Sequence, residues 1–574
     1  MVFPVNRFWR RTVLSITAIA VACPVSVLPT NAQRRTSASN SAARPAATQS
    51  SQDNLAALSN AANALKGGRL EEAEALVRQV VRDAPRDTNA RVLLGVVLEQ
   101  RGQVTEAEAE YREALRLQPK NVSALANLGV LFAHTRRVDQ AIETFEKVLR
   151  LEPAQAVAVY NLGTLYAARG KYQEALPLLE RAAGWPAKAG GTGPTDMGLL
   201  TTLLNVYAHA GRSGEAESLA DWLERAAGDD PRILFTLALS LAESHEYERA
   251  IRMFERTNVL RPNTFEVLYN LGVAQYNLDR LSEATATLTA AAALRPAEPE
   301  PQYRLGLIAS ARGDSRAAFA FWLKALELRP DFAEANFMFG EELLKTQQPD
   351  QAGVYYARAL AQDPSKLLYY IRLGVAHFRG QRYAQAREAF NGGLAKFPDN
   401  SNLYFLLGYA SRAEGRYDEA VAAFEQAQRR QPDNADVLSN LGYIASQRGE
   451  QEKAERLLRR AIALDPQGFP AHHDLGRLLV KLRRYDEALS VLRRGAELNK
   501  KDPGVHYQLF LAYSRLRRKA EADQELATFK QLDEVNRHGA TALGMTVPAS
   551  EIEVLPPIPA AAAGETKKPV APRD

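Results

Sequence analysis

Few residues of this sequence have the types and spacing that could do chemistry. His472, His473 and Asp474 form its one histidine cluster, and such side chains are common metal ligands. Adjacent residues on a helix point in different directions, however, so the two histidines are poorly placed to share one metal ion. Glu341 and Glu342 could supply a general acid and a general base, but neighbours in a helical pattern fit ordinary surface charge. The sequence therefore predicts no metal site and no acid–base pair.

Nucleophile and phosphate-binding motifs are also missing from the sequence. Cys23 is the single cysteine, and neither a Gly-x-Ser-x-Gly elbow nor a His-Glu-x-x-His pair occurs. The Gly-Gly-Thr-Gly run at residues 190–193 resembles a phosphate-binding loop, but it follows a helical pattern, and no Gly-Lys-Ser/Thr comes after it. We therefore predict that the protein is not an enzyme and has no catalytic residue and no cofactor.

The elements that must position any functional side chain belong to a repeat. Residues 401–434 and 435–468 carry the same landmarks, and every landmark of the first segment recurs 34 residues later. In the first segment the landmarks are Leu407, Gly408, Gly415, Ala420, Phe424, Ala427 and Pro432. A fixed period of this length indicates an array of identical structural units.

Each unit has the pattern of two helices, at 402–414 and 417–430 in the first copy. Apolar residues recur at three- and four-residue spacing, which is typical of an amphipathic helix. Gly415 suits a left-handed end of the first helix, and Pro432 cannot continue the second. Asp433-Asn434 can then cap the next helix through a side-chain oxygen. Two such helices cannot bury their apolar faces alone, so they must stack on neighbouring units.

These landmarks resemble the tetratricopeptide (TPR) repeat, whose period is 34 residues. The resemblance predicts an all-α fold, a right-handed α-solenoid superhelix of about 14 tandem helix-turn-helix repeats with a disordered N-terminal spacer and C-terminal tail. It suggests an exported bacterial multi-TPR protein. We expect units to begin at Asn54, Thr88, Val122, Ala156, Met197, Pro231, Phe265, Pro299, Ala333, Leu367, Ser401, Ala435, Phe469 and Pro503.

The composition divides the chain around this array. We expect a glycine-rich, exposed insertion between two sub-arrays, because the repeat phase breaks there. The last unit lacks the closing proline, as terminal caps often depart from the pattern. The expected segments are a signal peptide (1–32), a flexible spacer (33–53), repeats 1–4 (54–183), the insertion (184–196), repeats 5–14 (197–532), and a capping segment with a Pro/Ala-rich disordered tail (533–574).

The first residues have the pattern of an export signal. Three arginines precede an apolar run, Val13–Val27, and small residues ending at Ala32 suit cleavage. The run is short for a membrane span, which needs ~20 residues. We expect cleavage after Ala32. Lipidation at Cys23, an uncleaved anchor and a twin-arginine signal at Arg10-Arg11 stay open as alternatives.

Charge argues against a nucleic-acid partner. The chain has 72 Lys+Arg and 67 Asp+Glu, and residues 1–32 contain three arginines and no acid, so the remainder has 69 − 67, or +2. A nucleic-acid protein would show a clustered basic face. Outside the export signal, little net charge remains.

From the export signal we expect a protein of the periplasm or a secreted one, with association to the outer membrane as an alternative and membrane attachment only through a lipid on Cys23.

The TPR resemblance also implies where a partner would bind. In this family the first helices line a concave groove, and their second, fifth, ninth and twelfth positions point inward. Aromatic residues at these positions supply large amphipathic contact area. The family's carboxylate clamp needs lysine at the fifth position, and no unit has one. The predicted groove-lining residues are Phe235, Tyr269, Tyr276, Tyr303, Phe337, Phe378, Phe405, Tyr409 and Tyr443.

From these observations we expect a non-enzymatic scaffold of a bacterial cell envelope that binds extended protein or peptide segments in the groove. Two alternatives stay open. Tyrosines also stack on sugars, so the ligand could be a polysaccharide handled by an export machine. The array could also be an accessory subunit of a separate enzyme. The sequence leaves open whether each predicted groove-lining aromatic ring binds a partner or packs against the next repeat.

Overall fold

The computed structural model describes residues 46–186 and 196–542. Within these ranges the regular structure consists of 28 helices without a strand, which confirms the predicted all-α solenoid. The predicted signal peptide lies outside the described residues, as do the spacer up to residue 45, the centre of the insertion and the tail from residue 543.

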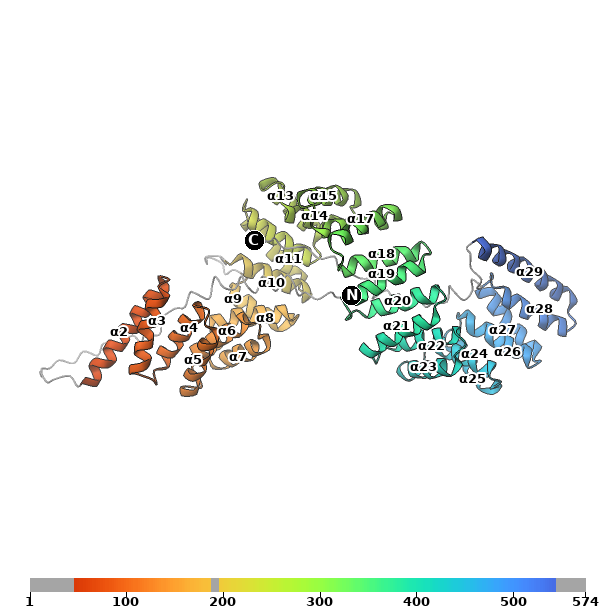
Figure 1. Cartoon of the computed structure of the whole chain (residues 1–574), viewed down its shortest axis with the longest axis horizontal. Coiled ribbons are helices and arrows are strands. Elements are labelled where there is room, and N and C mark those ends of the chain that lie inside the picture. The colour runs from red at the N-terminus through yellow and green to blue at the C-terminus, as the bar shows by residue number, and fades with distance from the viewer. Residues whose placement is uncertain (1–45, 187–195, 543–574) are drawn as a thin grey trace. The chain divides into compact units, whose positions relative to one another are not determined.

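The described residues form two compact units (Figure 1). The N-terminal unit ends at Leu294 and the C-terminal unit begins at Arg295. The N-terminal unit contains α2 (Ala46–Lys66), α3 (Leu70–Asp83), α4 (Thr88–Gln100), α5 (Val104–Leu117), α6 (Val122–His134), α7 (Val138–Leu151), α8 (Ala156–Ala168), α9 (Tyr172–Ala183), α10 (Met197–His209), α11 (Ser213–Ala226), α12 (Pro231–Glu243), α13 (Tyr247–Leu260), α14 (Phe265–Asn277) and α15 (Leu281–Leu294). The C-terminal unit contains α16 (Pro299–Ala311), α17 (Ser315–Leu328), α18 (Ala333–Lys345), α19 (Pro349–Gln362), α20 (Leu367–Arg379), α21 (Tyr383–Lys396), α22 (Ser401–Ala413), α23 (Tyr417–Arg430), α24 (Ala435–Gln447), α25 (Gln451–Leu464), α26 (Phe469–Lys481), α27 (Tyr485–Leu498), α28 (Pro503–Arg515) and α29 (Lys519–Ala542).

The helices pack as consecutive hairpins, each made of a first helix, called A, and a second helix, called B. Thirteen of the fourteen expected unit starts coincide with the first residue of an A helix. The exception is α2, which begins at Ala46 rather than Asn54 and so occupies the end of the segment expected to be a flexible spacer. No proline or glycine follows Pro45 before Lys66, and alanine and glutamine favour helix, which explains the difference.

Local chemistry sets where each helix begins and ends. The Asn434 side-chain oxygen accepts a hydrogen bond from the Val437 backbone N–H at 3.0 Å and so caps α24, as expected. Gly415 has φ +81°, the left-handed conformation that ends α22. Helix α23 ends at Arg430, two residues before Pro432.

Small residues let the two helices of a hairpin approach closely. A Cβ atom placed on Gly408 would lie 2.8 Å from the Phe424 ring, and one on Gly442 would lie 2.7 Å from Leu458. Ala420 and Ala454, on the facing B helices, are fully buried. Gly408 and Gly442 are therefore required by the large B-helix residues that pack over them.

Within each unit the A helices lie on the inner side of the stack. Most consecutive A helices pack on each other, for example α4 on α6 and α24 on α26. No two consecutive B helices of the described ranges pack as closely as these. Each unit therefore curves toward its A helices. We call the surface that they form the A-helix face.

The break in repeat phase at residues 184–196 does not interrupt the packing of the N-terminal unit. Helix α9 before the break packs on α10 after it. Leu179 of α9 and Leu200 of α10 are fully buried in one hydrophobic core. The two sub-arrays expected from the sequence thus share a continuous core.

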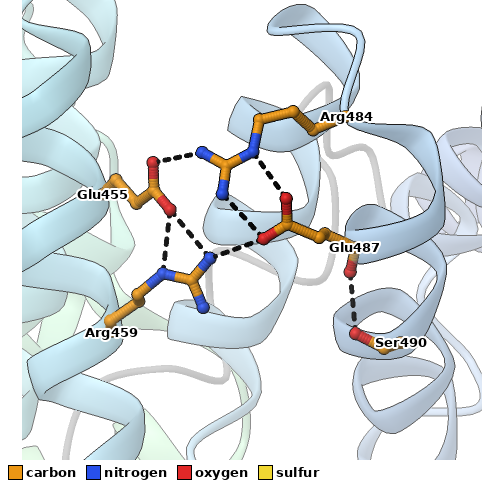
Figure 2. Close-up of polar contacts among 5 residues, drawn as sticks. All are labelled: Glu455, Arg459, Arg484, Glu487 and Ser490. Atoms are coloured by element: carbon orange, nitrogen blue, oxygen red, sulfur yellow. Dashed lines mark hydrogen bonds and ion pairs between the residues drawn. The ribbon is translucent and has the colours of Figure 1, made fainter.

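Ion pairs join the B helices on the other side of the stack. Figure 2 shows Glu455 and Arg459 of α25 with Arg484 and Glu487 at the start of α27. Arg484 pairs with Glu455 at 2.6 Å and with Glu487 at 2.7 Å, and Arg459 reaches Glu487 at 3.1 Å. The Arg484 hydrogen bond holds the pKa of the Glu455 carboxyl below its usual range. Both arginines of this cluster, Arg459 and Arg484, therefore have carboxylate partners.

Candidate protein-interaction surface

The structure places most of the predicted groove-lining aromatics inside the array. Two of the nine, Tyr276 and Tyr443, are half-buried. The others have at most 9% of their surface exposed: Phe235, Tyr269, Tyr303, Phe337, Phe378, Phe405 and Tyr409.

Ring contacts explain this burial. The fifth residue of a unit packs against the large B-helix residue of its own hairpin, so the ring centroids of Phe405 and Phe424 lie 5.8 Å apart. Equivalent pairs are Phe235 with Phe254 at 5.8 Å and Phe337 with Tyr356 at 5.6 Å.

The ninth and twelfth positions also pack between neighbouring A helices. Phe378 of α20 lies 5.2 Å from Tyr409 of α22. The expectation that the seven buried rings line a binding groove is therefore corrected. These rings pack within and between hairpins, and they offer little ring surface to a partner.

Tyr443 lies at the centre of a contact among three consecutive A helices. The guanidinium carbon of Arg412, on α22, lies over the Tyr443 ring at 4.9 Å from its centroid. The guanidinium carbon of Arg477, on α26, lies over the same ring at 5.0 Å. Arg412 also lies 4.9 Å from the Tyr409 centroid. Burial raises the pKa of the Tyr443 hydroxyl, so the ring stays neutral.

The two arginines of this cluster differ in their ionic partners. Arg477 pairs with Asp474, one turn earlier on α26, at 3.0 Å. Burial raises the pKa of the Asp474 carboxyl, and Arg477 opposes that rise. Among the described residues, the guanidinium of Arg412 contacts tyrosine rings and no carboxylate. Arg416, four residues later, pairs with Glu419, and Arg448, at the end of α24, pairs with Asp418.

Arg412 and Arg477 were not among the residues predicted from the sequence. They are the twelfth residue of the unit that begins at Ser401 and the ninth of the unit that begins at Phe469. Both positions point inward by the same rule that selected the aromatics. The positional pattern could have found them, had it been applied to basic side chains.

Other polar contacts also join consecutive A helices. In the N-terminal unit the Asn205 amide donates to Glu243 at 2.8 Å, and Ser240 donates to the Asn205 oxygen at 2.8 Å. In the C-terminal unit Arg372 pairs with Glu341 at 2.9 Å. Burial raises the pKa of the Glu341 carboxyl, and Arg372 counters this. Glu341 therefore joins repeats, as does its neighbour Glu342, which accepts from Ser310 at 2.6 Å.

The histidine cluster divides as expected from its spacing. His472 is buried and its Nδ1 lies 3.0 Å from the Gly468 carbonyl oxygen, whereas His473 stacks on Phe469 with centroids 5.7 Å apart. Across residues 46–186 and 196–542, no group of three or more His, Cys, Asp or Glu side chains could hold a metal ion. In the same ranges no helix combines the length and apolarity that crossing a bilayer requires.

The repeats define the class of protein. Family models of the tetratricopeptide repeat match residues 58–122, 101–156, 127–192, 235–299 and 337–401, and a second such model matches residues 411–479 and 449–509. The chain belongs to the tetratricopeptide repeat family. Its array of helical hairpins is a protein–protein interaction scaffold, and the matched models describe a repeat and not an enzyme.

Solved structures with a similar fold include three proteins. Yeast Tom70 is 17% identical, with coverage of 77% of this chain and 99% of that chain and a TM-score of 0.31. The Cut9–Hcn1 hetero-tetramer of the APC/C is 16% identical over 82% and 92%, with a TM-score of 0.35. YrrB, described as a TPR protein with an unusual peptide-binding site, is 18% identical over 32% and 95%, with a TM-score of 0.30. No curated protein sequence matches this chain.

Proposed function

We propose that this chain is an exported scaffold of a bacterial cell envelope that binds extended segments of partner proteins along its A-helix face. One observation carries the proposal. Side chains of three consecutive A helices meet at Tyr443, and all three residues, Tyr443, Arg412 and Arg477, are only half-buried, so part of each side chain is open to solvent. A segment lying across the A helices would contact several repeats at once, and half-buried tyrosine and arginine are typical anchors of such contacts.

Affinity capture with variants of the half-buried tyrosines tests the binding surface. The full-length chain, purified with its partners from its native host, is compared with Tyr276→Ala and Tyr443→Ala, one in each unit. We expect at least one variant to lose a partner while circular dichroism shows an unchanged fold. An unchanged partner set in both variants, with normal folding, would refute binding at the A-helix face.

The envelope location is a proposal that depends on the sequence of residues 1–32. A basic start, an apolar run and small residues up to Ala32 support it. The intact mass of the protein isolated from its host measures the mature N-terminus directly. A chain starting after Ala32 supports simple export, a lipid-modified Cys23 supports membrane attachment, and a retained Met1 contradicts cleavage.

A further inference from the structure

Arg412, on the A-helix face of the C-terminal unit, forms no ion pair with any carboxylate of the described residues, although at longer range its charge opposes the rise that burial causes in the pKa of the Asp474 carboxyl. Arg412 lies over two tyrosine rings, Tyr409 and Tyr443. A guanidinium over an aromatic ring is attracted through its positive charge. The cation–π contacts leave its N–H groups able to donate hydrogen bonds.

The second guanidinium of the site is arranged in the same way but is already paired. Arg477 lies over the Tyr443 ring from the following repeat and contacts Asp474 at 3.0 Å. Arg477 already has a carboxylate partner, so Arg412 supplies the positive charge at Tyr443 that has no ion-pair partner among the described residues. Their side chains come from α22 and α26, so the geometry exists only when three successive repeats stack.

We infer that Arg412, Tyr443 and Arg477 form a site for the carboxylate of an acidic side chain in an extended segment of a partner protein. This inference rests on the proposed function, because it names the chemistry of the segment that the A-helix face binds. The edge of a guanidinium matches the two oxygens of a carboxylate, and such charge-assisted bonds are short and strong.

Charge favours a carboxylate over a phosphate group. The positive charge of Arg412 balances one carboxylate, whereas a phosphate dianion would remain in excess and would face the Asp474 carboxylate. The Tyr443 ring itself is a poor platform for a sugar, because guanidinium groups already lie over it. Neither arginine occupies the fifth position of a unit, so the site differs from the lysine-based clamp that the sequence excluded.

Fluorescence anisotropy with short peptide probes tests this site on the full-length protein. The main probe is a fluorescein-labelled octapeptide with four glutamates alternating with glycine, and its counterpart has glutamine in place of glutamate. We expect the glutamate probe alone to bind, with an affinity that falls as salt is raised. Arg412→Gln removes the unpaired charge and should weaken binding about tenfold or more, as expected for a charge-assisted hydrogen bond.

The matched control is Arg429→Gln on α23. This exposed arginine contacts a backbone oxygen of its own helix, that of Glu425 at 3.4 Å, and its loss changes the net charge of the chain equally. We expect its affinity to stay within about twofold of the wild type. Equal weakening by the two variants would mean unspecific attraction and would overturn the site, as would Arg412→Gln binding as tightly as the wild type.

Two further probes separate other ligands. Tighter binding of a phosphoserine octapeptide or of an oligogalacturonate than of the glutamate probe would overturn the assignment to an acidic protein segment. If no acidic probe binds although the Tyr276 or Tyr443 variants lose native partners, this site is wrong and the proposed function stands. If the probes bind as expected but no native partner depends on the A-helix face, the site stands and the proposed function fails.

Discussion

Replacing Phe405 by alanine separates packing from binding at the A-helix face. Sequence pattern assigns this ring to a partner, whereas the structure buries it to 6% exposure against Phe424 and Tyr409, at 5.8 and 6.1 Å between centroids. Phe→Ala substitutions in such cores cost ~3–5 kcal/mol. Because two aromatic contacts are lost together, we expect about 4 kcal/mol, or roughly a 1,000-fold increase in local opening.

Hydrogen exchange measured by mass spectrometry is the suitable assay. A repeat array can open locally, so one global midpoint would average the effect over the whole chain. Peptides from α22 and α23 should lose about three orders of magnitude of protection, whereas peptides from the N-terminal unit should be unchanged.

Tyr443→Ala is the comparison for this experiment. Its ring is half-buried and takes part in two cation–π contacts, each ~0.5–1 kcal/mol, so we expect a loss of ~1–2 kcal/mol. Normal protection of α22 and α23 in Phe405→Ala, together with loss of a binding partner, would refute our placement of the ring in the core.

Three other perturbations follow from single contacts. Gly408→Ala should destabilise α22 and α23 by ~1–3 kcal/mol because its Cβ would meet Phe424. Gly392→Ala lies on an exposed helix surface with its nearest neighbour 3.5 Å away, so it should stabilise the protein by ~0.5–1 kcal/mol. Urea unfolding measures both changes in stability, and a destabilised Gly392→Ala variant would contradict the packing argument. Glu455→Gln should lower the free energy of unfolding by about 1 kcal/mol or less, because the arginine partners of Glu455 are partly exposed. A double-mutant cycle with Arg484→Gln measures the coupling energy, and a coupling energy of zero would contradict a stabilising role for the ion pairs of Figure 2. The hydrogen bond from His506 to Glu525, at 2.6 Å, raises the pKa of the histidine. Its stabilisation is present below the unfolded value of 6.5 and is lost as pH rises through the folded value. The protection of α28 relative to the intrinsic exchange rate at each pH should therefore be greater at about pH 6 than at about pH 8.5, and His506→Gln should abolish that difference in protection.

The positions of the helices could be predicted because local residues set them. Gly415 requires its left-handed turn, Pro432 ends a helix and Asn434 caps the next one, so a period of 34 in these residues fixes the period of the hairpins. The start of the first helix, α2, could not be predicted in this way. The residues from Ala46 to Asp53 carry no repeat landmark, and their polar composition suggested a flexible segment, although their helix propensity favours the extension of α2 that the structure has.

The roles of side chains on the A-helix face could be predicted only in part. A positional rule tells which side of a helix a residue occupies, but exposure also depends on the size of the residues opposite. Phe405 is buried because a phenylalanine fills position 424, whereas Tyr443 is half-buried between two arginines. By the same rule Arg412 lies at an inward position, but the predicted groove-lining set contained only aromatic residues.

Site-specific photocrosslinking in the native host tests the central claim most directly, namely that the A-helix face is the surface that partners use. A benzophenone amino acid replaces Gln447, an exposed residue one turn after Tyr443 on α24, and in a second strain it replaces Ala422, an exposed residue on helix B α23. We predict crosslinks to a partner protein from position 447 and none to that partner from position 422. Equal crosslinking at the two positions, or crosslinking at 422 alone, would contradict the account.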